Sequence, residues 1–575
     1  MLINEIKNHR YLILGIVVIG LVVFGFNLDN GLFWDDDDWI INNPFVHNFS
    51  HIGDLFTKDI LSGIGLKSNY YRPILLLTFA FNYVISGIKP FSYHLVSNLL
   101  HILNGVLIFT LLQNVLKRRW LSFIAALFFV INPLQTEAVT YISGRGDPLN
   151  VFFMLLSLVF FLKKSRIWSL AFLVLAILSR ETAVIFPFFL MAFYIAFLTK
   201  ERFLSALKTS FKKALPYFGI VAVYSLLRLT VLNFKDTLNF YGVENIYTES
   251  IYIRVLTFFH ALLDYFKLIF APVGLHMERD LELIISVFTL PALLTLGILI
   301  GLVWWLVFLY RKEGKEGISD FRIWFFGLAV FFINLGLSSG ILASVNALIY
   351  EHWLYFGLFG IATIFAFYMD RLIVFVRDKK ILRLIVIGAL IAYFAFLGVA
   401  SAKRNLAWGD PIAFYQDILR YSPDSVRINN NLGNLYNAEG DLETAVMYYE
   451  KAIEAEDIFA QPHYNIGVIL MNQEDFEGAK AQYLKAIELN PNFYYSYQNL
   501  AFIQAKEGNL PGAAETLETL LTIRSNDPAI YYNLALVYAG INKTQKAIEV
   551  ATKGLEYARN PEERAVLEGL LTKLR

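Results

Sequence analysis

Four consecutive carboxylates, Asp35 to Asp38, stand out as a segment that could do chemistry, and they lie between Trp34 and Trp39. A carboxylate within ~3 Å of a hydroxyl can take its proton, and partial removal from water raises the carboxyl pKa toward the range needed. In a soluble protein the same run is usually a solvated acidic turn. The remainder of the chain decides between these two interpretations.

Further charged and imidazole side chains recur in short motifs along the first 400 residues. They are Arg72, His94 and His101, Glu137, Arg145 with Asp147, Arg180 with Glu181, His276 with Arg279, and Glu351 with His352. Each alone is explained by an ion pair at a helix end or an anchor at the lipid headgroups. Charged groups are costly inside a bilayer, so a set of them on one membrane face predicts a composite site.

Composition places these motifs in a membrane protein. Hydrophobic residues make up 57% of the chain, aromatic residues 16% and charged residues only 17%, which exceeds what a soluble core needs. A net charge of +1 gives no basis for a nucleic-acid partner. The absence of cysteine excludes disulfides, thiolate metal sites and a cysteine nucleophile.

Apolar stretches of about 20 residues, the length that crosses a bilayer, recur up to residue 400 and then stop. We therefore predict an all-α chain with a polytopic membrane domain over 1–400 and a soluble domain over 401–575. The first span has no small-x-small cleavage site after it, so we expect a retained anchor. The predicted spans, about 11 in number, are 11–27, 93–115, 120–133, 148–162, 166–179, 182–198, 214–232, 282–309, 321–340, 350–368 and 382–400.

Lysine and arginine clusters predict the orientation, because short loops rich in them stay in the cytoplasm. The clusters include 117–119, 163–166, 200–213, 311–312 and 371–383. They share one side only if the apolar stretch 253–270 does not cross the bilayer. We then expect a multi-pass protein of the plasma (inner) membrane with a cytoplasmic N-terminus. The polar motifs and everything after residue 400 would be extracytoplasmic.

The soluble part repeats itself every 34 residues. Small residues recur at that interval at Gly433, Gly467, Ala501 and Ala535, and asparagine recurs at Asn431, Asn465, Asn499 and Asn533. This period is typical of tetratricopeptide repeats, in which small residues let paired helices approach closely. We predict repeats that start near 427, 461, 495 and 529, followed by a cap helix over 561–575.

The four asparagines have two interpretations. On the concave face of an α-solenoid they would form a ladder of amides, each able to hold a peptide backbone through a donor and an acceptor. The repeats would then bind a polypeptide acceptor or a protein partner. Alternatively, asparagine at this position is ordinary repeat consensus without a ligand.

The loop over 28–92 is the longest early break between spans, and it holds the acidic run together with Tyr71, Arg72 and Pro73. Its semi-apolar segments suit the membrane interface. We expect an ordered outer loop.

Taken together, these motifs resemble bacterial relatives of the TMTC family, which are transmembrane, tetratricopeptide-containing O-mannosyltransferases of the GT-C class. The resemblance covers the whole chain in the right order. It is carried by Phe33-Trp34-Asp35-Asp36, Tyr71-Arg72-Pro73, His94 through His101, Glu137-Ala138-Val139, Gly144-Arg145-Gly146-Asp147, Glu351-His352-Trp353-Leu354-Tyr355 and the terminal repeats.

The resemblance implies an inverting glycosyltransferase that uses a polyprenyl-phosphate-linked sugar and a first-loop acid as base. The catalytic pair falls on Asp35 and Asp36. The Gly-Arg-Ala-Asp element of animal members matches Gly144–Asp147, and their Glu-Arg-Tyr-Leu-Tyr element matches Glu351–Tyr355. Here histidine at position 352 replaces arginine and is only partly charged at neutral pH.

Transfer of a sugar from a lipid phosphate to a hydroxyl needs a base, for which we favour Asp35, and cations that stabilise the leaving phosphate. No general acid is needed, because a phosphate monoester is already a good anion. The predicted residues that bind the donor phosphate or sugar are Arg72, His94, Glu137, Arg145, Asp147, His276, Arg279, Glu351 and His352.

A divalent cation is the rival explanation for the carboxylates, because hard oxygens suit magnesium, manganese or calcium. Asp36 and Asp147 would be its ligands, whereas the favoured interpretation requires no cofactor. Two rival functions also remain. One is a membrane scaffold that recruits partners through its repeats, and the other is an enzyme of the O-antigen ligase or polymerase type. Mannose and protein Ser/Thr are the favoured sugar and acceptor, and other hexoses, glycolipids and glycans stay open.

Overall fold

The computed structural model describes residues 8–234, 246–279, 281–313, 319–341, 348–558 and 561–575. Within these ranges the chain forms helices and no strand, which confirms the predicted all-α class. It divides into two compact units, the first reaching Asp417 and the second starting at Ile418. This division falls inside α18 (Pro411–Leu419), whereas the predicted boundary at residue 400 lies inside α17 (Lys380–Ala407).

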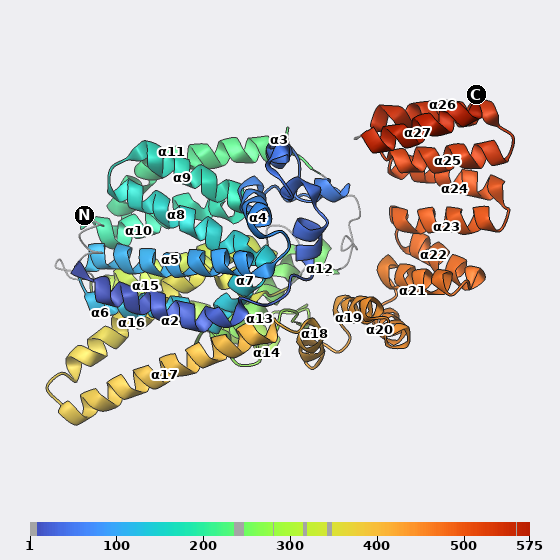
Figure 1. Cartoon of the computed structure of the whole chain (residues 1–575). Coiled ribbons are helices and arrows are strands. Elements are labelled where there is room, and N and C mark those ends of the chain that lie inside the picture. Colours follow the sequence, from blue (N-terminus) through green and yellow to red (C-terminus); the bar gives the residue numbers. More distant parts are fainter. Residues whose placement is uncertain (1–7, 235–245, 280, 314–318, 342–347, 559–560) are drawn as a thin grey trace. The chain divides into compact units, whose positions relative to one another are not determined.

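The first unit is a bundle of long apolar helices that lie side by side (Figure 1). Among the described residues, eight helical segments are long and apolar enough to cross a membrane, and a ninth qualifies if a bent pair is one span. The eight are α2 (Arg10–Phe24) with η1 (Gly25–Asn27), α5 (Pro90–Leu116), η7 (Ile142–Arg145) with α8 (Gly146–Leu162), η8 (Glu181–Ile185) with α10 (Phe186–Phe193) and η9 (Tyr194–Leu198), α14 (Leu290–Arg311), α15 (Asp320–Ser338), α16 (Gly357–Phe375) and α17.

The bent pair is the predicted span at 120–133. Helix α6 (Arg119–Ile131) ends before Pro133, which has no N–H to continue a helix, and the chain turns by 53° into η6 (Pro133–Gln135) and α7 (Thr136–Thr140). The Asn132 side chain accepts a hydrogen bond of 3.1 Å from the Leu134 amide and stabilises the break. The bend turns Glu137, on α7, into the buried interior of the unit.

Two other predicted spans have helices that do not meet the length and apolarity criterion. They are α9 (Arg166–Ser179), which has only 14 residues, and α11 (Phe203–Leu229), which carries several lysines. Both pack inside the same bundle, α9 against α8 and α11 against α10. The total of about 11 crossings therefore stays a prediction.

Two predicted spans start too early. The span at 282–309 corresponds to α14, which begins at Leu290 with a proline in its first turn. The span at 350–368 corresponds to α16, which begins at Gly357, because Glu351–Leu354 forms the separate 3₁₀ turn η10. The stretch predicted not to cross, 253–270, is helix α13 (Ile251–Phe270), preceded by α12 (Ile246–Glu249), and it is not one of the eight segments.

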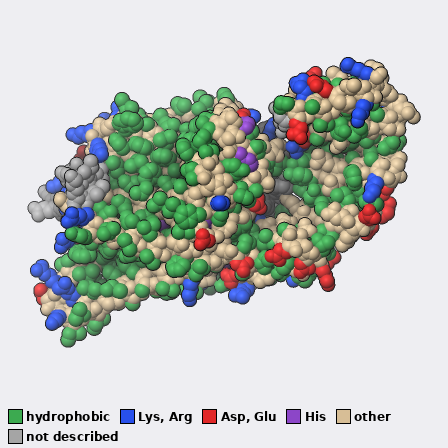
Figure 2. Space-filling model, viewed as in Figure 1, with side chains coloured by type: hydrophobic (Ala, Val, Ile, Leu, Met, Phe, Trp, Pro, Cys, Tyr) green, Lys and Arg blue, Asp and Glu red, His purple; other side chains and the backbone are tan. Residues whose placement is uncertain are grey.

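The surface of the first unit has an apolar belt and a basic end. Hydrophobic side chains cover much of its visible face, and lysine and arginine gather where α16 leads into α17 (Figure 2). Helix α7 lies toward the other end of the bundle (Figure 1). This is the charge distribution expected when the basic end faces the cytoplasm.

The first loop is folded, which agrees with the predicted order. Its elements are η2 (Asp37–Ile41, a π-helical turn), η3 (Pro44–Val46), η4 (Phe49–His51), α3 (Ile52–Thr57), η5 (Ser62–Ile64) and α4 (Pro73–Ser86). Trp39, Ile40 and Leu55 pack with Leu75 and Phe79 of α4 in one core cluster. This core fixes the segment that follows Asp35 and Asp36.

The second unit is a stack of helix pairs, coloured orange to red in Figure 1. First helices begin at intervals of 34 residues, at 426, 460, 494 and 528, as the repeat period predicts. The helices are α19 (Val426–Glu439), α20 (Leu442–Ala455), α21 (Ala460–Asn472), α22 (Phe476–Leu489), α23 (Tyr494–Lys506), α24 (Leu510–Ile523), α25 (Pro528–Gly540), α26 (Thr544–Tyr557) and α27 (Pro561–Leu574).

Replacing Gly467 by alanine is expected to destabilise the repeats. A Cβ at this position would lie 2.7 Å from the ring of buried Tyr483, so the ring would have to shift, at a cost of about 1–3 kcal/mol. Gly569→Ala is the matched control, because nothing lies within 4 Å of that Cβ and alanine favours the helix. Hydrogen exchange over α21 and α22 should quicken only in Gly467→Ala. Equal protection in both variants would contradict the packing argument.

Candidate active site

The acidic run begins at a strained residue. Trp34 has φ of 65°, a left-handed conformation that a bulky side chain adopts only at a cost of about 1–3 kcal/mol. The next residue, Asp35, is half-buried, and Asp36 is only 2% exposed. The Asp36 carboxylate accepts hydrogen bonds from the Ser143 amide at 2.8 Å and the Ser143 hydroxyl at 2.5 Å. Two adjacent carboxylates therefore occupy distinct environments.

Burial raises the pKa of Asp36 from 3.8 to about 7, and the neighbouring Asp35 carboxylate adds to this increase, although both Ser143 hydrogen bonds oppose it. Asp36 is therefore close to half-protonated at neutral pH. When Asp36 is protonated, it places no second negative charge beside Asp35. Asp35 is the more accessible of the two and the better placed to meet a hydroxyl.

Asp36→Asn is expected to change how stability depends on pH. Between pH 4 and 7 the folded chain keeps a proton on Asp36 that the unfolded chain has lost, so this group's contribution to stability falls as the pH rises through that window. At about 1.4 kcal/mol per pKa unit, the loss is up to about 4 kcal/mol. Asparagine does not ionise, so the variant lacks this pH dependence. The Tm of the variant minus the Tm of the parent should therefore be larger at pH 8 than at pH 5. An identical Tm difference at both pH values would contradict the shifted pKa.

Beyond the acidic run, Arg72 forms a two-point ion pair with Glu181. Its Nε and Nη2 donate to the two carboxylate oxygens at 3.0 and 2.6 Å, and the guanidinium carbon lies 4.5 Å from the centre of the Tyr70 ring. The charges that act on the Tyr70 hydroxyl are those of Arg72, Glu181, Arg180 and Asp35. This pair therefore neighbours the acidic run, and the Arg72 fork is already occupied.

Arg180 and Asp147 form a second ion pair beside the first. The Asp147 carboxylate belongs to the first turn of α8. The charged groups that act on it include Arg180, His352, Arg72 and Glu137. The Arg180 Nε is buried and has no hydrogen-bond partner. Asp147 thus lies between the first-loop group and the group around Glu137.

Glu137 organises the segment before α16. It is completely buried, and its Oε2 accepts hydrogen bonds from the amides of Glu351 at 2.8 Å and His352 at 3.1 Å. Its Oε1 lies 2.7 Å from the Nδ1 of His352. These contacts hold η10 against α7. The His352 ring, only partly buried, has its Nε2 left for other contacts.

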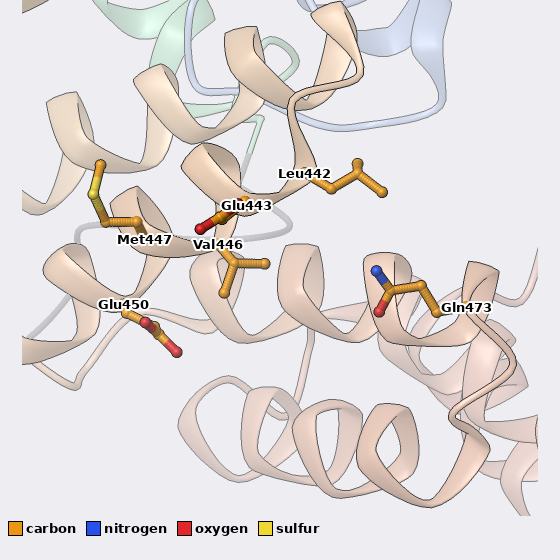
Figure 3. A pocket seen from close by; sticks show the side chains of 6 residues that line it. All are labelled: Leu442, Glu443, Val446, Met447, Glu450 and Gln473. Atoms are coloured by element: carbon orange, nitrogen blue, oxygen red, sulfur yellow. The ribbon is translucent and has the colours of Figure 1, made fainter.

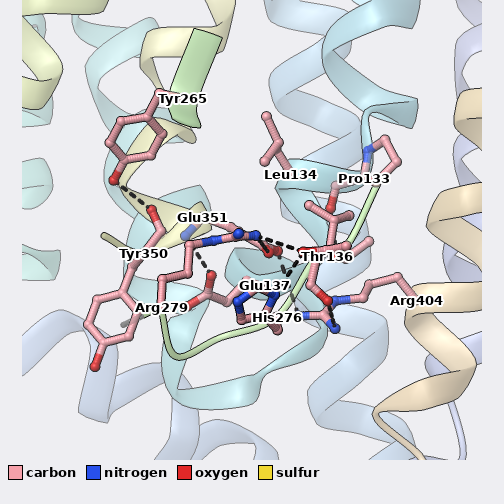
Figure 4. Close-up of polar contacts among 12 residues, drawn as sticks. Pro133, Leu134, Thr136, Glu137, Tyr265, His276, Arg279, Tyr350, Glu351 and Arg404 are labelled. Atoms are coloured by element: carbon pink, nitrogen blue, oxygen red, sulfur yellow. Dashed lines mark hydrogen bonds and ion pairs between the residues drawn. The ribbon is translucent and has the colours of Figure 1, made fainter. Parts of the chain in front are cut away.

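Glu351 lies between two guanidinium groups, Arg279 and Arg404 (Figure 4). The Arg279 Nη2 is 3.1 Å from one carboxylate oxygen, and the Arg404 Nη2 is 3.7 Å from the other. Burial raises the pKa of Glu351 even beside these two cations. Four buried atoms of this group have no hydrogen-bond partner: the Nε of Arg279, the Nε and Nη2 of Arg404, and Oε2 of Glu351. Unpaired buried donors are costly, so they indicate a ligand-binding position.

His276 completes this second group. Its Nδ1 lies 2.7 Å from the Gly274 carbonyl oxygen, to which it donates, and burial with the positive charges of Arg279 and Arg404 lowers its pKa to about 4. His276 is therefore neutral at physiological pH. Because its one N–H is on Nδ1, its Nε2 can accept a hydrogen bond, and the ring adds no charge to the cluster.

Two predicted site residues are held by hydrogen bonds within the protein. Arg145 is completely buried and donates four hydrogen bonds, to Ser97, Thr78, Asn82 and the Tyr93 carbonyl. His94 is 1% exposed, its Nε2 donates to the Asn30 carbonyl at 3.0 Å, and its Nδ1 is buried without a hydrogen-bond partner. These contacts tie Arg145 and His94 to α4, α5 and the first loop, and their role at the site stays a prediction.

The two carboxylates predicted as possible metal ligands have protein partners. Asp36 accepts hydrogen bonds from Ser143, Asp147 pairs with Arg180, and the part of the chain that the structure describes contains no group of three His, Asp or Glu placed to hold a metal ion. Metal dependence therefore stays a matter for experiment.

Several known proteins are similar to this chain in sequence. Protein O-mannosyl-transferase F38B6.6 of Caenorhabditis elegans is 24% identical over 440 residues, which cover 74% of this chain and 60% of that protein. Human protein O-mannosyl-transferase TMTC4 is 26% identical over 489 residues, 75% of this chain and 64% of the relative. Human TMTC1 is 40% identical over a shorter stretch of 134 residues, 22% of this chain and 15% of TMTC1.

The homologues of this chain are TMTC-family protein O-mannosyl-transferases. This finding confirms the predicted family. The chain spans less than two thirds of the length of the relatives named above. Tetratricopeptide-repeat models match residues 426–457, 460–493, 482–515 and 528–561, so the second unit is a tetratricopeptide-repeat domain.

Residues that the TMTC resemblance did not single out complete both groups. Arg404, Ser143, Arg180 and Glu181 each contact a predicted site residue, Arg404 at the longer distance of 3.7 Å. Arg180 and Glu181 are adjacent in the sequence, where an ion pair at a helix end was the simplest interpretation, but the structure pairs Arg180 with Asp147 and Glu181 with Arg72. Arg404 follows the last apolar run, a position where arginine commonly anchors a helix at the membrane surface. No local sequence pattern distinguishes a site residue from such an anchor.

In the repeats of this TMTC relative, the asparagine ladder is partly engaged by the array itself. Asn465 donates to Asn430 at 3.0 Å and Asn434 at 2.9 Å, and Asn499 donates to the Tyr483 hydroxyl at 3.1 Å. A bound peptide would hydrogen-bond to the side-chain carbonyl oxygens of these asparagines or displace their hydrogen bonds within the array. A separate cavity of about 440 Å³ lies on the first two repeats (Figure 3). It is lined by Leu442, Glu443, Val446, Met447, Glu450 and Gln473.

Proposed function

We propose that this protein transfers a mannose-like hexose from a polyprenyl-phosphate donor to a hydroxyl, favouring protein Ser/Thr, with inversion at the anomeric carbon. The observation that carries the proposal is the pair of arginines beside Glu351, Arg279 and Arg404, which have three buried nitrogen atoms without a hydrogen-bond partner. Guanidinium donors of this kind suit phosphate oxygens. Names of the homologues support transfer of mannose to protein.

The acceptor oxygen attacks the anomeric carbon from the face opposite the phosphate, so a single displacement inverts that centre. Asp35 takes the proton of the acceptor hydroxyl as the new C–O bond forms. The bond between the anomeric carbon and the phosphate oxygen breaks, and polyprenyl phosphate leaves with the electron pair. Asp36, held by Ser143, positions the segment that carries Asp35.

The leaving phosphate gains negative charge as the bond breaks, and fixed cations stabilise it more in the transition state than in the ground state. Arg279 and Arg404 supply this stabilisation because their free donors are already oriented by Glu351 and by the carbonyls of Gly274 and Leu275. His276 and His352 lie beside them and can bond sugar hydroxyls. Arg72 and Arg180 are committed to carboxylates and act on the electrostatics of the site instead.

We assign the end of the bundle that carries the acidic run and Glu351 to the extracytoplasmic side of the membrane. It lies opposite the end where lysine and arginine gather on the surface (Figure 2). A polyprenyl tail then stays in lipid while its phosphate and sugar reach the site. The repeat domain follows the last predicted span and belongs on the same side. It would present a polypeptide acceptor or bind a protein partner.

The test is transfer by the purified full chain, supplied with polyprenyl-phosphate mannose, glucose or an aminosugar analogue and with a Ser/Thr-rich polypeptide. We expect hexose on Ser or Thr, release of polyprenyl phosphate in equal amount, and an unchanged rate in the presence of EDTA. Loss of transfer with EDTA would overturn the metal-free mechanism. In parallel reactions that supply a glycolipid or a glycan in place of the polypeptide, transfer to these acceptors alone would overturn the protein acceptor. No release of polyprenyl phosphate from any donor would overturn the function.

A further inference from the structure

A cluster of aromatic rings connects the last span to the acidic run. Trp408 lies 4.4 Å from Phe414 and 5.6 Å from Tyr141 between ring centres, and Phe33 lies 5.8, 5.9 and 6.0 Å from Trp408, Phe414 and Tyr415. Trp34 lies 5.5 Å from Tyr415. Phe33, Trp408, Phe414 and Tyr415 are all at least nine-tenths buried. The two residues before Asp35 are therefore fixed by residues almost 400 positions later.

The cluster acts where the backbone is strained. The left-handed conformation of Trp34 is unfavourable for an aromatic residue, so it persists only where its surroundings hold it. Its carbonyl accepts the Asp37 amide at 3.1 Å, and the Phe33 carbonyl accepts the Asp36 amide at 3.4 Å. Ring contacts at Phe33 and Trp34 thus set the direction in which the next residue, Asp35, leaves the turn.

The same stretch is tied to the arginine group. Arg404 donates to the Leu275 carbonyl at 2.7 Å, and its guanidinium carbon lies 5.6 Å from the centre of the Phe414 ring. The next residue, Asn405, bonds the Val23 carbonyl, the Thr140 hydroxyl and, through its own carbonyl, Asn30. These bonds fix the end of α17 to three segments of the membrane unit. One short stretch therefore contacts both groups of the candidate site.

We propose that residues 404–415 form a positioning segment that holds the Phe33–Asp35 turn through the rings of Trp408, Phe414 and Tyr415. The base role of Asp35 rests on the proposed function. Apart from Arg404, which binds the leaving phosphate in the proposed function, the segment touches neither substrate nor reacting atoms. It keeps a strained turn closed, and it places Asp35 relative to the arginines because Arg404 belongs to the same stretch.

The first test does not depend on activity. Full-length Phe414→Ala and Tyr415→Ala, without donor, are compared by hydrogen exchange over residues 33–41 with Leu406→Ala, an exposed neighbour on the same stretch. We expect exchange in 33–41 to quicken about tenfold or more in the ring variants and not in Leu406→Ala. Tyr415→Phe, which keeps the ring, should restore the parent rate of exchange. Unchanged protection in both alanine variants would overturn the proposal.

Activity then separates positioning from binding. In the ring variants we expect kcat to fall about tenfold or more with an unchanged KM for the donor, because Asp35 is misplaced while the phosphate site is intact. An unchanged kcat together with altered exchange would also overturn the proposal. If Phe414→Ala does not fold, Phe414→Leu carries the same comparison. If exchange is altered in the ring variants but the parent chain transfers no sugar, the result would refute the proposed function and leave the packing role.

Discussion

Asp35→Asn is expected to lower kcat for sugar transfer by about 10²–10⁴-fold, the usual contribution of a general base. The amide keeps the size and polarity of the carboxylate but cannot take the acceptor proton. Donor binding should persist, because the arginines are unaffected, so the KM for the donor should stay near that of the parent. Initial rates over a range of donor concentrations measure both quantities.

Asp37→Asn is the matched control for Asp35, since it makes the same change two residues along the run at an exposed position. We expect its kcat to stay within about twofold of the parent, because Asp37 is exposed and solvent screens its charge from the proton transfer at Asp35. If Asp35→Asn retained the parent kcat, Asp35 would not be the base. An equal loss in both variants would mean that the run acts through its summed charge.

Arg404→Gln is expected to reduce kcat/KM for the donor by about 10²–10³-fold, the effect of removing one fixed donor from a developing anion. It also leaves Glu351 with Arg279 as its remaining charged partner. Breaking a buried pair costs roughly 3–5 kcal/mol, so Tm must be measured alongside activity. Arg404→Lys separates the two effects, because it keeps the charge and loses the planar fork.

Arg371→Gln is the control for Arg404, because it removes the same charge from an exposed ion pair with Asp320. Surface pairs contribute about 0–1 kcal/mol, so neither Tm nor kcat/KM should change appreciably. If Arg404→Gln behaved like this control, Arg404 would be an anchor at the end of α17. The phosphate site would then be limited to Arg279.

Local patterns were enough to predict the class of fold. Span positions follow from apolar runs and repeat boundaries from the 34-residue period, because both are local properties of the chain. Errors occurred where tertiary contacts decide. The helix predicted from residue 350 begins at Gly357, because Glu137 binds the amides of Glu351 and His352 and holds them in a separate turn.

The structure brings several of the predicted site residues together, and their pairings could not be predicted from the sequence. Glu137, Glu351 and Arg279 were identified as polar residues that a membrane anchor does not need. Arg145 looked equivalent, yet neutral acceptors on α4 and α5 take its donors. Arg404 and the ring cluster were missed, because a contact between Phe33 and Phe414 leaves no trace in the local pattern of either segment.

The central claim is that the acidic run and the two arginines beside Glu351 flank one donor. A cryo-EM structure of the slow Asp35→Asn variant with polyprenyl-phosphate mannose tests it most directly. The account predicts the phosphate within hydrogen-bond distance of Arg279 and Arg404, and the anomeric carbon facing residue 35. A donor phosphate bound elsewhere, or a sugar turned away from residue 35, would contradict it.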